Sequence, residues 1–155
     1  MDVLPLGAFV WTNFPFGNPP EARSQPGPSP HIAYHLGSDA TGLVMLAYTS
    51  SGPWRGAALG TPPGIVEFTG AEAAKVNQTA FHIDLRTLAK VRLTEAWFPR
   101  WADASRGIVG IADAGVQARV LQAAKTLAGR PETIEFRGIG IATTTTVRRP
   151  NPSRG

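Results

Sequence analysis

The sequence predicts a mainly β protein with minor α structure, in which a small curled antiparallel sheet or barrel is joined by one helix near the C-terminus. Short segments rich in aromatic and β-branched residues recur along the chain, as is typical of strands. The turns between them are supplied by 17 glycines and 14 prolines. At 155 residues the chain fits one domain, predicted over residues 1–137, followed by a flexible basic tail over residues 138–155.

The first half of the chain predicts three strands, at residues 8–16, 31–36 and 43–48. A long loop over residues 17–30 separates the first two and contains five prolines, which cannot donate to a β-ladder. Loops of this length inside a domain are usually functional or mobile. A turn over residues 37–42 joins the second and third strands, and the third ends in the hydroxyl-rich sequence Thr49-Ser50-Ser51.

The second half predicts further strands at residues 65–68, 79–85 and 88–93, with a helical turn at 71–76. A single helix follows, with Asp113 as its N-cap and Gly129 as its end. Its apolar residues recur at helical spacing, at Val116, Val120, Ala123 and Leu127. The mixed segment before it places Trp97, Phe98 and Trp101 in the predicted core.

Composition excludes several classes of function. The net charge is +4, but residues 1–140 carry 12 Lys and Arg against 11 Asp and Glu, so basicity alone does not indicate a nucleic-acid partner. The absence of cysteine excludes disulfides, thiolate metal sites and cysteine catalysis. No apolar run reaches the roughly 18 residues that span a bilayer, and no leader segment is visible. We therefore expect a cytoplasmic protein without a membrane partner.

Three residues are candidates for catalysis. His31 begins a strand directly after the long loop, and histidine exchanges protons near neutral pH. Thr49 and Ser50 end the neighbouring strand, where a hydroxyl could bind a phosphate oxygen. The alternatives are a capping histidine without a chemical role and hydroxyls that hydrogen-bond their own backbone.

Substrate-binding candidates lie in the two loops beside these strands. Arg23 is in the first loop, and Trp54 and Arg55 are in the second. Arginine beside an aromatic ring suits single-stranded nucleic acid, because bases stack on the ring and phosphates pair with the guanidinium. These residue types are also ordinary at a protein surface.

A metal-dependent hydrolase that uses His31 or His35 with Asp84 is a further alternative. On one strand, however, these two histidines would lie about 13 Å apart, too far for a single ion. The sequence therefore predicts no metal site and no cofactor.

In their order along the chain, several motifs resemble the PemK/MazF family of toxin endoribonucleases. The landmarks are Gly7, Val10-Trp11, Phe14-Pro15-Phe16, Pro26-Gly27-Pro28-Ser29-Pro30, Ala47-Tyr48-Thr49-Ser50, Glu67-Phe68, residues 79–85, Trp97-Phe98 and the helix over 114–128. Each motif is short, and it is their shared order over residues 7–129 that carries the resemblance. The family's arginine position is occupied here by His31, and the proline that usually follows it by Ile32.

The resemblance implies an SH3-like β-barrel over residues 1–137 that forms a homodimer and is bound by a cognate antitoxin. It also implies metal-independent cleavage of single-stranded RNA, in which the ribose 2′-hydroxyl attacks the adjacent phosphate. Thr49 matches the family's hydroxyl position, with Ser50 as the alternative register, and His31 would replace the arginine as an acid or base. A histidine offers at most two donors against five on a guanidinium, so a catalytically inactive barrel that binds a protein or nucleic acid is the alternative function.

Overall fold

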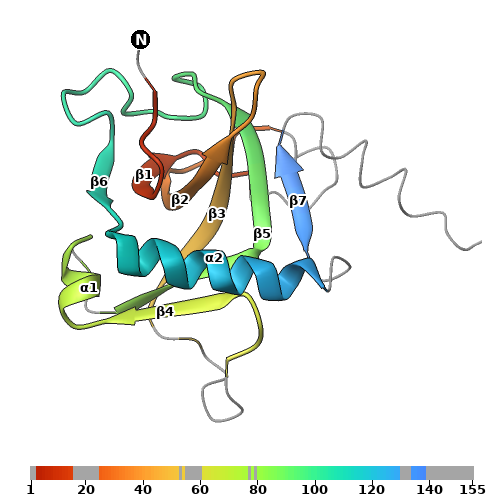
Figure 1. Cartoon of the computed structure of the whole chain (residues 1–155). Coiled ribbons are helices and arrows are strands. Elements are labelled where there is room, and N and C mark those ends of the chain that lie inside the picture. The colour runs from red at the N-terminus through yellow and green to blue at the C-terminus, as the bar shows by residue number, and fades with distance from the viewer. Residues whose placement is uncertain are drawn as a thin grey trace, which may run out of the picture.

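The computed structural model describes residues 3–15, 25–52, 54, 61–76, 78, 80–129 and 134–138. These residues form a mainly β fold, as predicted, with one sheet and two helices (Figure 1). The elements are β1 (Ala8–Thr12), β2 (His31–Ser38), β3 (Leu43–Ser51), β4 (Ile65–Thr69), α1 (Ala71–Ala74), β5 (Ala80–Arg92), β6 (Ile108–Ile111), α2 (Ala114–Ala128) and β7 (Glu135–Gly138). The strand order is β4-β5-β3-β2-β1-β6 with antiparallel neighbours, and β7 pairs with β5 in parallel.

The sheet is curled, but its hydrogen-bonded path is open. In the described part of the chain, β4 and β6 stand at the two ends of the path and do not pair with each other. The two ends nevertheless approach through α1, because the carbonyl oxygen of Lys75 lies 2.9 Å from the position that a Cβ atom would take at Gly110. Only glycine admits this contact, since real Cβ atoms do not approach so closely.

The turn between β2 and β3 forms where the sequence predicts it. Asp39 accepts hydrogen bonds at Oδ1 from the backbone N–H of Thr41 at 2.9 Å and of Leu43 at 3.1 Å. The hydroxyl of Thr41 donates to the same oxygen. These bonds satisfy the turn backbone locally, as aspartate commonly does.

One strand replaces the two that the sequence predicts at residues 79–85 and 88–93. The register of β5 against β3 runs from Tyr48 opposite Asp84 directly to Ala47 opposite Leu88, so residues 85–87 are extra residues in a bulge. The polar pair Arg86-Thr87, which resembles a break in the sequence, lies in this bulge. The strand β1 also ends earlier than predicted, at Thr12, and Phe16 lies outside the described residues.

Both faces of the sheet are buried. Successive side chains of a strand point to opposite faces, so apolar residues occur at successive positions and not only at every second one. One core lies between the sheet and α2, with members that include Phe9, Tyr34, Phe68, Phe81, Val116 and Val120. The second core lies on the opposite face and includes Val10, Phe14, Val44, Leu46, Val91 and Phe98. Trp97 belongs to the second core and Trp101 packs against it, as predicted.

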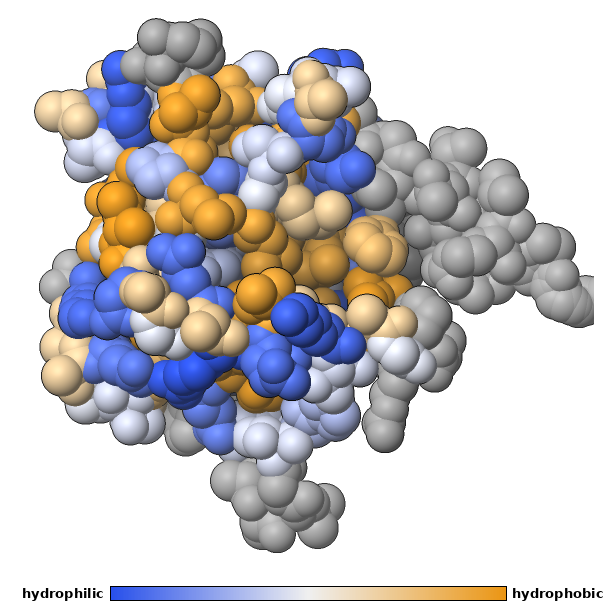
Figure 2. All heavy atoms as spheres, viewed as in Figure 1, coloured by the Kyte–Doolittle hydropathy of each residue, from blue (hydrophilic) through white to orange (hydrophobic). Residues whose placement is uncertain are grey.

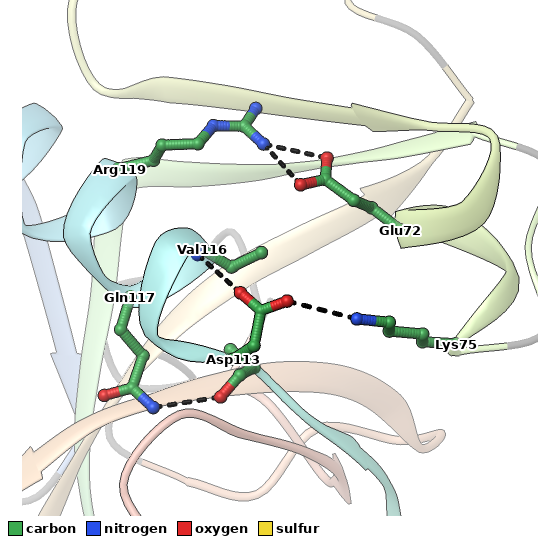
Figure 3. Close-up of polar contacts among 7 residues, drawn as sticks. Glu72, Lys75, Asp113, Val116, Gln117 and Arg119 are labelled. Carbon is green, nitrogen blue, oxygen red and sulfur yellow. Dashed lines mark hydrogen bonds and ion pairs between the residues drawn. The ribbon is translucent and has the colours of Figure 1, made fainter.

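The helix α2 begins and ends at the predicted residues. Asp113 is its N-cap and accepts the backbone N–H of Val116 at 2.9 Å, and Gly129 follows its last residue (Figure 3). The helix crosses the front of the sheet in Figure 1 and buries Val116, Val120 and Leu127. The longer of the two described helices, it has 15 residues, and neither has the length and hydropathy that a membrane span requires.

Two ion pairs join α1 to α2. Glu72 accepts hydrogen bonds from Arg119 with both carboxylate oxygens, at 2.8 and 2.9 Å, and Lys75 contacts Asp113 at 3.1 Å (Figure 3). The pKa of Asp113 is lowered, first by the hydrogen bond from the Val116 backbone and then by Lys75. Hydrophilic residues gather over α1 and the adjacent part of α2 in Figure 2.

Candidate active site

A groove opens where β2 and β3 separate. Their ladder ends at Ala33 opposite Tyr48, after which β2 continues beside β1 and β3 continues beside β5. We call this space the His31 groove. It has a volume of about 350 Å³, within the range of small-molecule sites. Its lining residues are Phe9, Trp11, Pro30, His31, Ile32, Tyr48, Thr49, Ser50, Ser51, Val76, Gln78 and Phe81.

All three residues predicted for catalysis line this groove. His31 is the first residue of β2, and Thr49 and Ser50 lie near the end of β3. The antiparallel hairpin brings the start of one strand beside the end of the other, which is why residues far apart in the sequence meet here. Of the residues predicted to bind substrate, Arg23 and Arg55 lie outside the described residues.

His31 lies at the polar edge of the groove. It is half-buried, pairs with Thr12 across β1 and β2, and has Nδ1 at 3.3 Å from the carbonyl oxygen of Ser29. A carbonyl oxygen only accepts hydrogen bonds, so a hydrogen bond to Ser29 requires the ring hydrogen on Nδ1, which leaves the lone pair of the neutral ring on Nε2. This is the tautomer that a general base at Nε2 requires.

Thr49 bridges the two separating strands. Its side chain is 8% exposed, and its hydroxyl donates to the carbonyl oxygen of Ile32 at 2.5 Å. The single hydroxyl hydrogen of Thr49 is therefore used by the backbone, and the oxygen can act toward a ligand only as an acceptor. Ser50 is less buried and also lines the groove, so its hydroxyl is the better placed donor.

Arg100 is a residue of this region that the sequence does not indicate. Its guanidinium carbon lies 4.6 Å from the centroid of the Trp11 ring, and Trp11 lines the groove. The contact is a cation–π interaction between residues on separate elements. No periodicity or motif marks Arg100, because its position depends on how the segment before β6 folds against β1.

Trp54 does not line the groove. It packs against residues of β4 and β5 in what we call the Trp54 cluster (Trp54, Glu67, His82, Asp84 and Arg86), whose His82 pairs with Ser50 across β5 and β3. The backbone N–H of Trp54 donates to Glu67, and its ring makes a T-shaped contact with the His82 ring, with 5.6 Å between the ring centroids. Arg86 lies 5.0 Å from the centroid of the same ring and binds both carboxylate oxygens of Asp84. The polar groups of this cluster thus largely bind each other.

The residues of the metal alternative are also engaged elsewhere. Both ring nitrogens of His35 are bonded, Nδ1 to the carbonyl oxygen of Pro5 at 2.8 Å and Nε2 to the Ser38 hydroxyl at 3.1 Å. Asp84 is held by Arg86. Among the residues that the structure describes, no group of three or more His, Asp or Glu side chains is arranged to hold a metal ion.

A second groove, between α2 and β2, has a different character. It is lined mainly by aliphatic side chains, and two leucines at its border, Leu6 and Leu121, are each 56% exposed. Apolar side chains are visible above α2 in Figure 2. This groove offers contact area but few groups for chemistry, so the His31 groove is the candidate active site.

Comparison with protein-family models, with curated proteins and with solved structures finds no match. The resemblance to PemK/MazF toxins therefore depends on the order of short sequence motifs. The groove itself contains His31, the hydroxyls of Thr49, Ser50 and Ser51, and the Trp11 ring covered by Arg100.

Proposed function

We propose that this protein is a metal-independent endoribonuclease that cleaves single-stranded RNA in the His31 groove. One observation carries the proposal: a histidine and the hydroxyl-bearing residues Thr49, Ser50 and Ser51 line the same groove, which has the volume of a small-ligand site. The half-buried Trp11 lines it as well, whereas Phe9 and Phe81 belong to the core beneath it. An unpaired base can stack on an indole ring such as that of Trp11, whereas a base inside a duplex cannot reach it.

In the proposed reaction, His31 acts as the general base. Nε2 accepts the proton of a ribose 2′-hydroxyl, and the 2′ oxygen then attacks the neighbouring phosphorus. The bond from phosphorus to the 5′ oxygen breaks, and that oxygen takes a proton from solvent. The products are one strand with a 2′,3′-cyclic phosphate and one with a 5′-hydroxyl.

The hydroxyls of Thr49 and Ser50 have different tasks in this proposal. Ser50 donates a hydrogen bond to a non-bridging phosphate oxygen, where negative charge grows in the transition state. Thr49 keeps its bond to the Ile32 carbonyl and so holds the ends of β2 and β3 at a fixed separation. Thr49 is then a positioning residue, although it is the one that matches the family's hydroxyl position.

The test is cleavage of single-stranded RNA by purified protein in the presence of a chelator. We expect cleavage with cyclic phosphate ends, a loss of about 10²–10³-fold in Ser50→Ala and a loss in Thr49→Val, whose side chain has the same shape without the hydroxyl. Thr49→Ser retains a hydroxyl and is the matched control, so it should stay active. Absence of cleavage by the wild-type protein would refute the proposal.

A second candidate function is RNA or protein binding without cleavage. The bond from Thr49 to Ile32 favours it, because a hydroxyl fully explained by backbone structure needs no catalytic role. Under this alternative His31→Ala leaves function unchanged. His31→Arg, which restores the family's residue, would create or increase cleavage.

The family itself is part of the proposal, as a toxin of a type II toxin–antitoxin system with an SH3-like barrel. It is supported by the curled sheet, whose ends approach through α1, and by the position of α2 after the last antiparallel strand. A homodimer and a cognate antitoxin are the partners that this family implies. Light scattering of the purified chain and co-purification with the product of a neighbouring gene test these partners.

A further inference from the structure

Arg100 differs from most other cations of the described chain because no carboxylate neutralises it. Lys75, Arg86, Lys90, Arg119 and Arg137 all form ion pairs. Arg100 is exposed, and among the described residues its side chain makes only the contact with the Trp11 ring at 4.6 Å. A guanidinium in this state keeps its donors available for an anion.

The segment that carries Arg100 is held in place by the second core. Phe98 is fully buried and Trp97 is 6% exposed, and the N–H of Asn13 donates to the Trp97 carbonyl at 2.8 Å. The Asn13 side chain adds a second bond, to the carbonyl of Ala96 at 3.0 Å. Arg100 therefore projects from an ordered support on which its position is largely fixed before any ligand binds.

At the end of this segment, the backbone of Gly107 lies close to both Arg100 and Trp11. Gly107 has φ +77, and a Cβ atom there would lie 3.0 Å from the Cβ of Arg100 and 3.7 Å from that of Trp11. Its carbonyl oxygen accepts the N–H of Trp11 at 3.0 Å. Arg106, at φ 59, adopts a left-handed conformation and donates to the carbonyl of Trp101. A glycine at this point lets the arginine approach the tryptophan.

From this geometry we infer that Trp11 and Arg100 form the nucleotide anchor of the His31 groove, in which a base stacks on the indole and the guanidinium binds a backbone phosphate. The inference rests on the proposed function for the identity of the ligand, a single-stranded nucleic acid. It extends that proposal by supplying a phosphate-binding cation on a different segment from the one where the resemblance places an arginine. A guanidinium stacked on an aromatic ring still directs its N–H donors outward in its own plane, so both contacts can form together.

The anchor predicts a preference for single strands over duplexes and a dependence on salt. Stacking on Trp11 needs an unpaired base, and a phosphate contact releases counterions. Loss of a single contact of this kind makes the negative slope of log K against log salt less steep by about 0.7 for a single strand.

The experiment measures binding without cleavage. Its probe is a short single-stranded oligoribonucleotide of mixed sequence in which every 2′-hydroxyl is methylated, so that 2′-hydroxyl attack is impossible. Fluorescence anisotropy is recorded over a range of salt concentrations for the wild type, Arg100→Gln, Trp11→Phe and Trp11→Ala. Arg92→Gln is the matched control, because Arg92 is also exposed and forms no ion pair among the described residues, but lies at the end of β5 away from the groove lining.

We expect Arg100→Gln to weaken binding by about fivefold to tenfold and to make the salt slope less steep by about 0.7, while Arg92→Gln resembles the wild type. Trp11→Ala should lose about tenfold or more, and Trp11→Phe, which preserves the fold of β1, should lose less. Circular dichroism confirms that each variant is folded.

Equal binding by Arg100→Gln and Arg92→Gln, or no binding by the wild type, would overturn the inference. The outcome is separable from that of the cleavage assay. Binding that depends on Arg100, without cleavage of unmethylated RNA, refutes the ribonuclease and upholds the anchor. Cleavage that is indifferent to Arg100→Gln upholds the ribonuclease and refutes the anchor.

Discussion

The His31 groove and the Trp54 cluster contain similar residue types, but the arginines beside their tryptophans differ in pairing. Each has a histidine, and each has a tryptophan in contact with an arginine, at 4.6 Å for Arg100 on Trp11 and 5.0 Å for Arg86 on Trp54. In the cluster, Asp84 takes the hydrogen bonds of Arg86, and the carboxylate of Glu67 takes the N–H of Trp54. Arg100 has no such partner among the described residues.

This difference indicates what each region is for. Polar groups that bind each other fix the structure around them and leave little for a ligand, whereas a charged group on a fixed support without a counter-charge is ready for an anion. By residue type alone, Trp54 and Trp11 would be equally good candidates for ligand binding. They differ in whether the arginine on the ring is paired with a carboxylate.

Replacing each region's histidine should produce the largest contrast. We expect His31→Asn to reduce RNA cleavage by about 10²–10⁴-fold, because it removes the general base, with little change in stability. His82→Asn should leave cleavage intact, since His82 is buried and does not line the groove. Initial rates of cleavage and urea unfolding of both variants check this. A fully active His31→Asn, or an inactive but folded His82→Asn, would contradict the assignment.

Removal of the cluster's carboxylate should affect stability instead. Asp84→Asn deprives Arg86 of its charged partner in a site where the Asp84 side chain is 11% exposed. We expect the free energy of unfolding to fall by about 2 kcal/mol. Binding of the methylated oligonucleotide should be unchanged. Weakened binding by the folded variant would show that the cluster contacts the ligand.

Two glycine substitutions distinguish the effect of backbone strain from the effect of displacing Arg100. Gly107→Ala and Gly42→Ala both place a side chain at positive φ, +77 and +89, but only the first meets a neighbour, the Cβ of Arg100. Each should cost about 1–2 kcal/mol of stability. Only Gly107→Ala should also weaken oligonucleotide binding, by a few fold. Equal binding by the two variants would indicate that the position of Arg100 does not matter.

The smallest effect concerns Asp113, the N-cap of α2. The pKa of Asp113 is below its ordinary value of 3.8 in the folded chain, first because of the Val116 N–H and then because of Lys75. A lowered folded pKa stabilises the protein above the ordinary value, and this contribution is lost as pH falls through the folded value. Asp113→Ala should therefore be less stable than wild type near neutral pH, and the difference should shrink in acid. Urea unfolding near neutral pH and in acid measures the difference in the free energy of unfolding between the two proteins. A difference that does not change with pH would contradict the charge-based account.

The sequence predicts the parts of the fold that local chemistry determines. Alternation identifies β2, Asp39 marks the turn after it, and Asp113 marks the start of α2. Features that depend on contacts between distant segments are not predicted from the sequence. The bulge that joins two predicted strands into β5 and the parallel pairing of β7 have no local signal, because both are set by neighbouring strands.

The candidate site divides in the same way. His31, Thr49 and Ser50 are found from the sequence because strand ends beside a long loop are where polar side chains gather. Arg100 is missed because only tertiary packing brings it to Trp11. The hydrogen bond from Thr49 to Ile32 is missed for the same reason, although it changes which hydroxyl is available to a phosphate.

The most direct test of the central claim, that single-stranded RNA binds in the His31 groove, compares the two tryptophans in one titration. The indole N–H signals of Trp11 and Trp54 are followed by nuclear magnetic resonance as the methylated oligonucleotide is added. We predict that the Trp11 signal shifts together with the backbone signals of His31 and Ser50, while the Trp54 signal stays in place. A shift centred on Trp54, or no shift at Trp11 when the oligonucleotide is bound, would contradict the account.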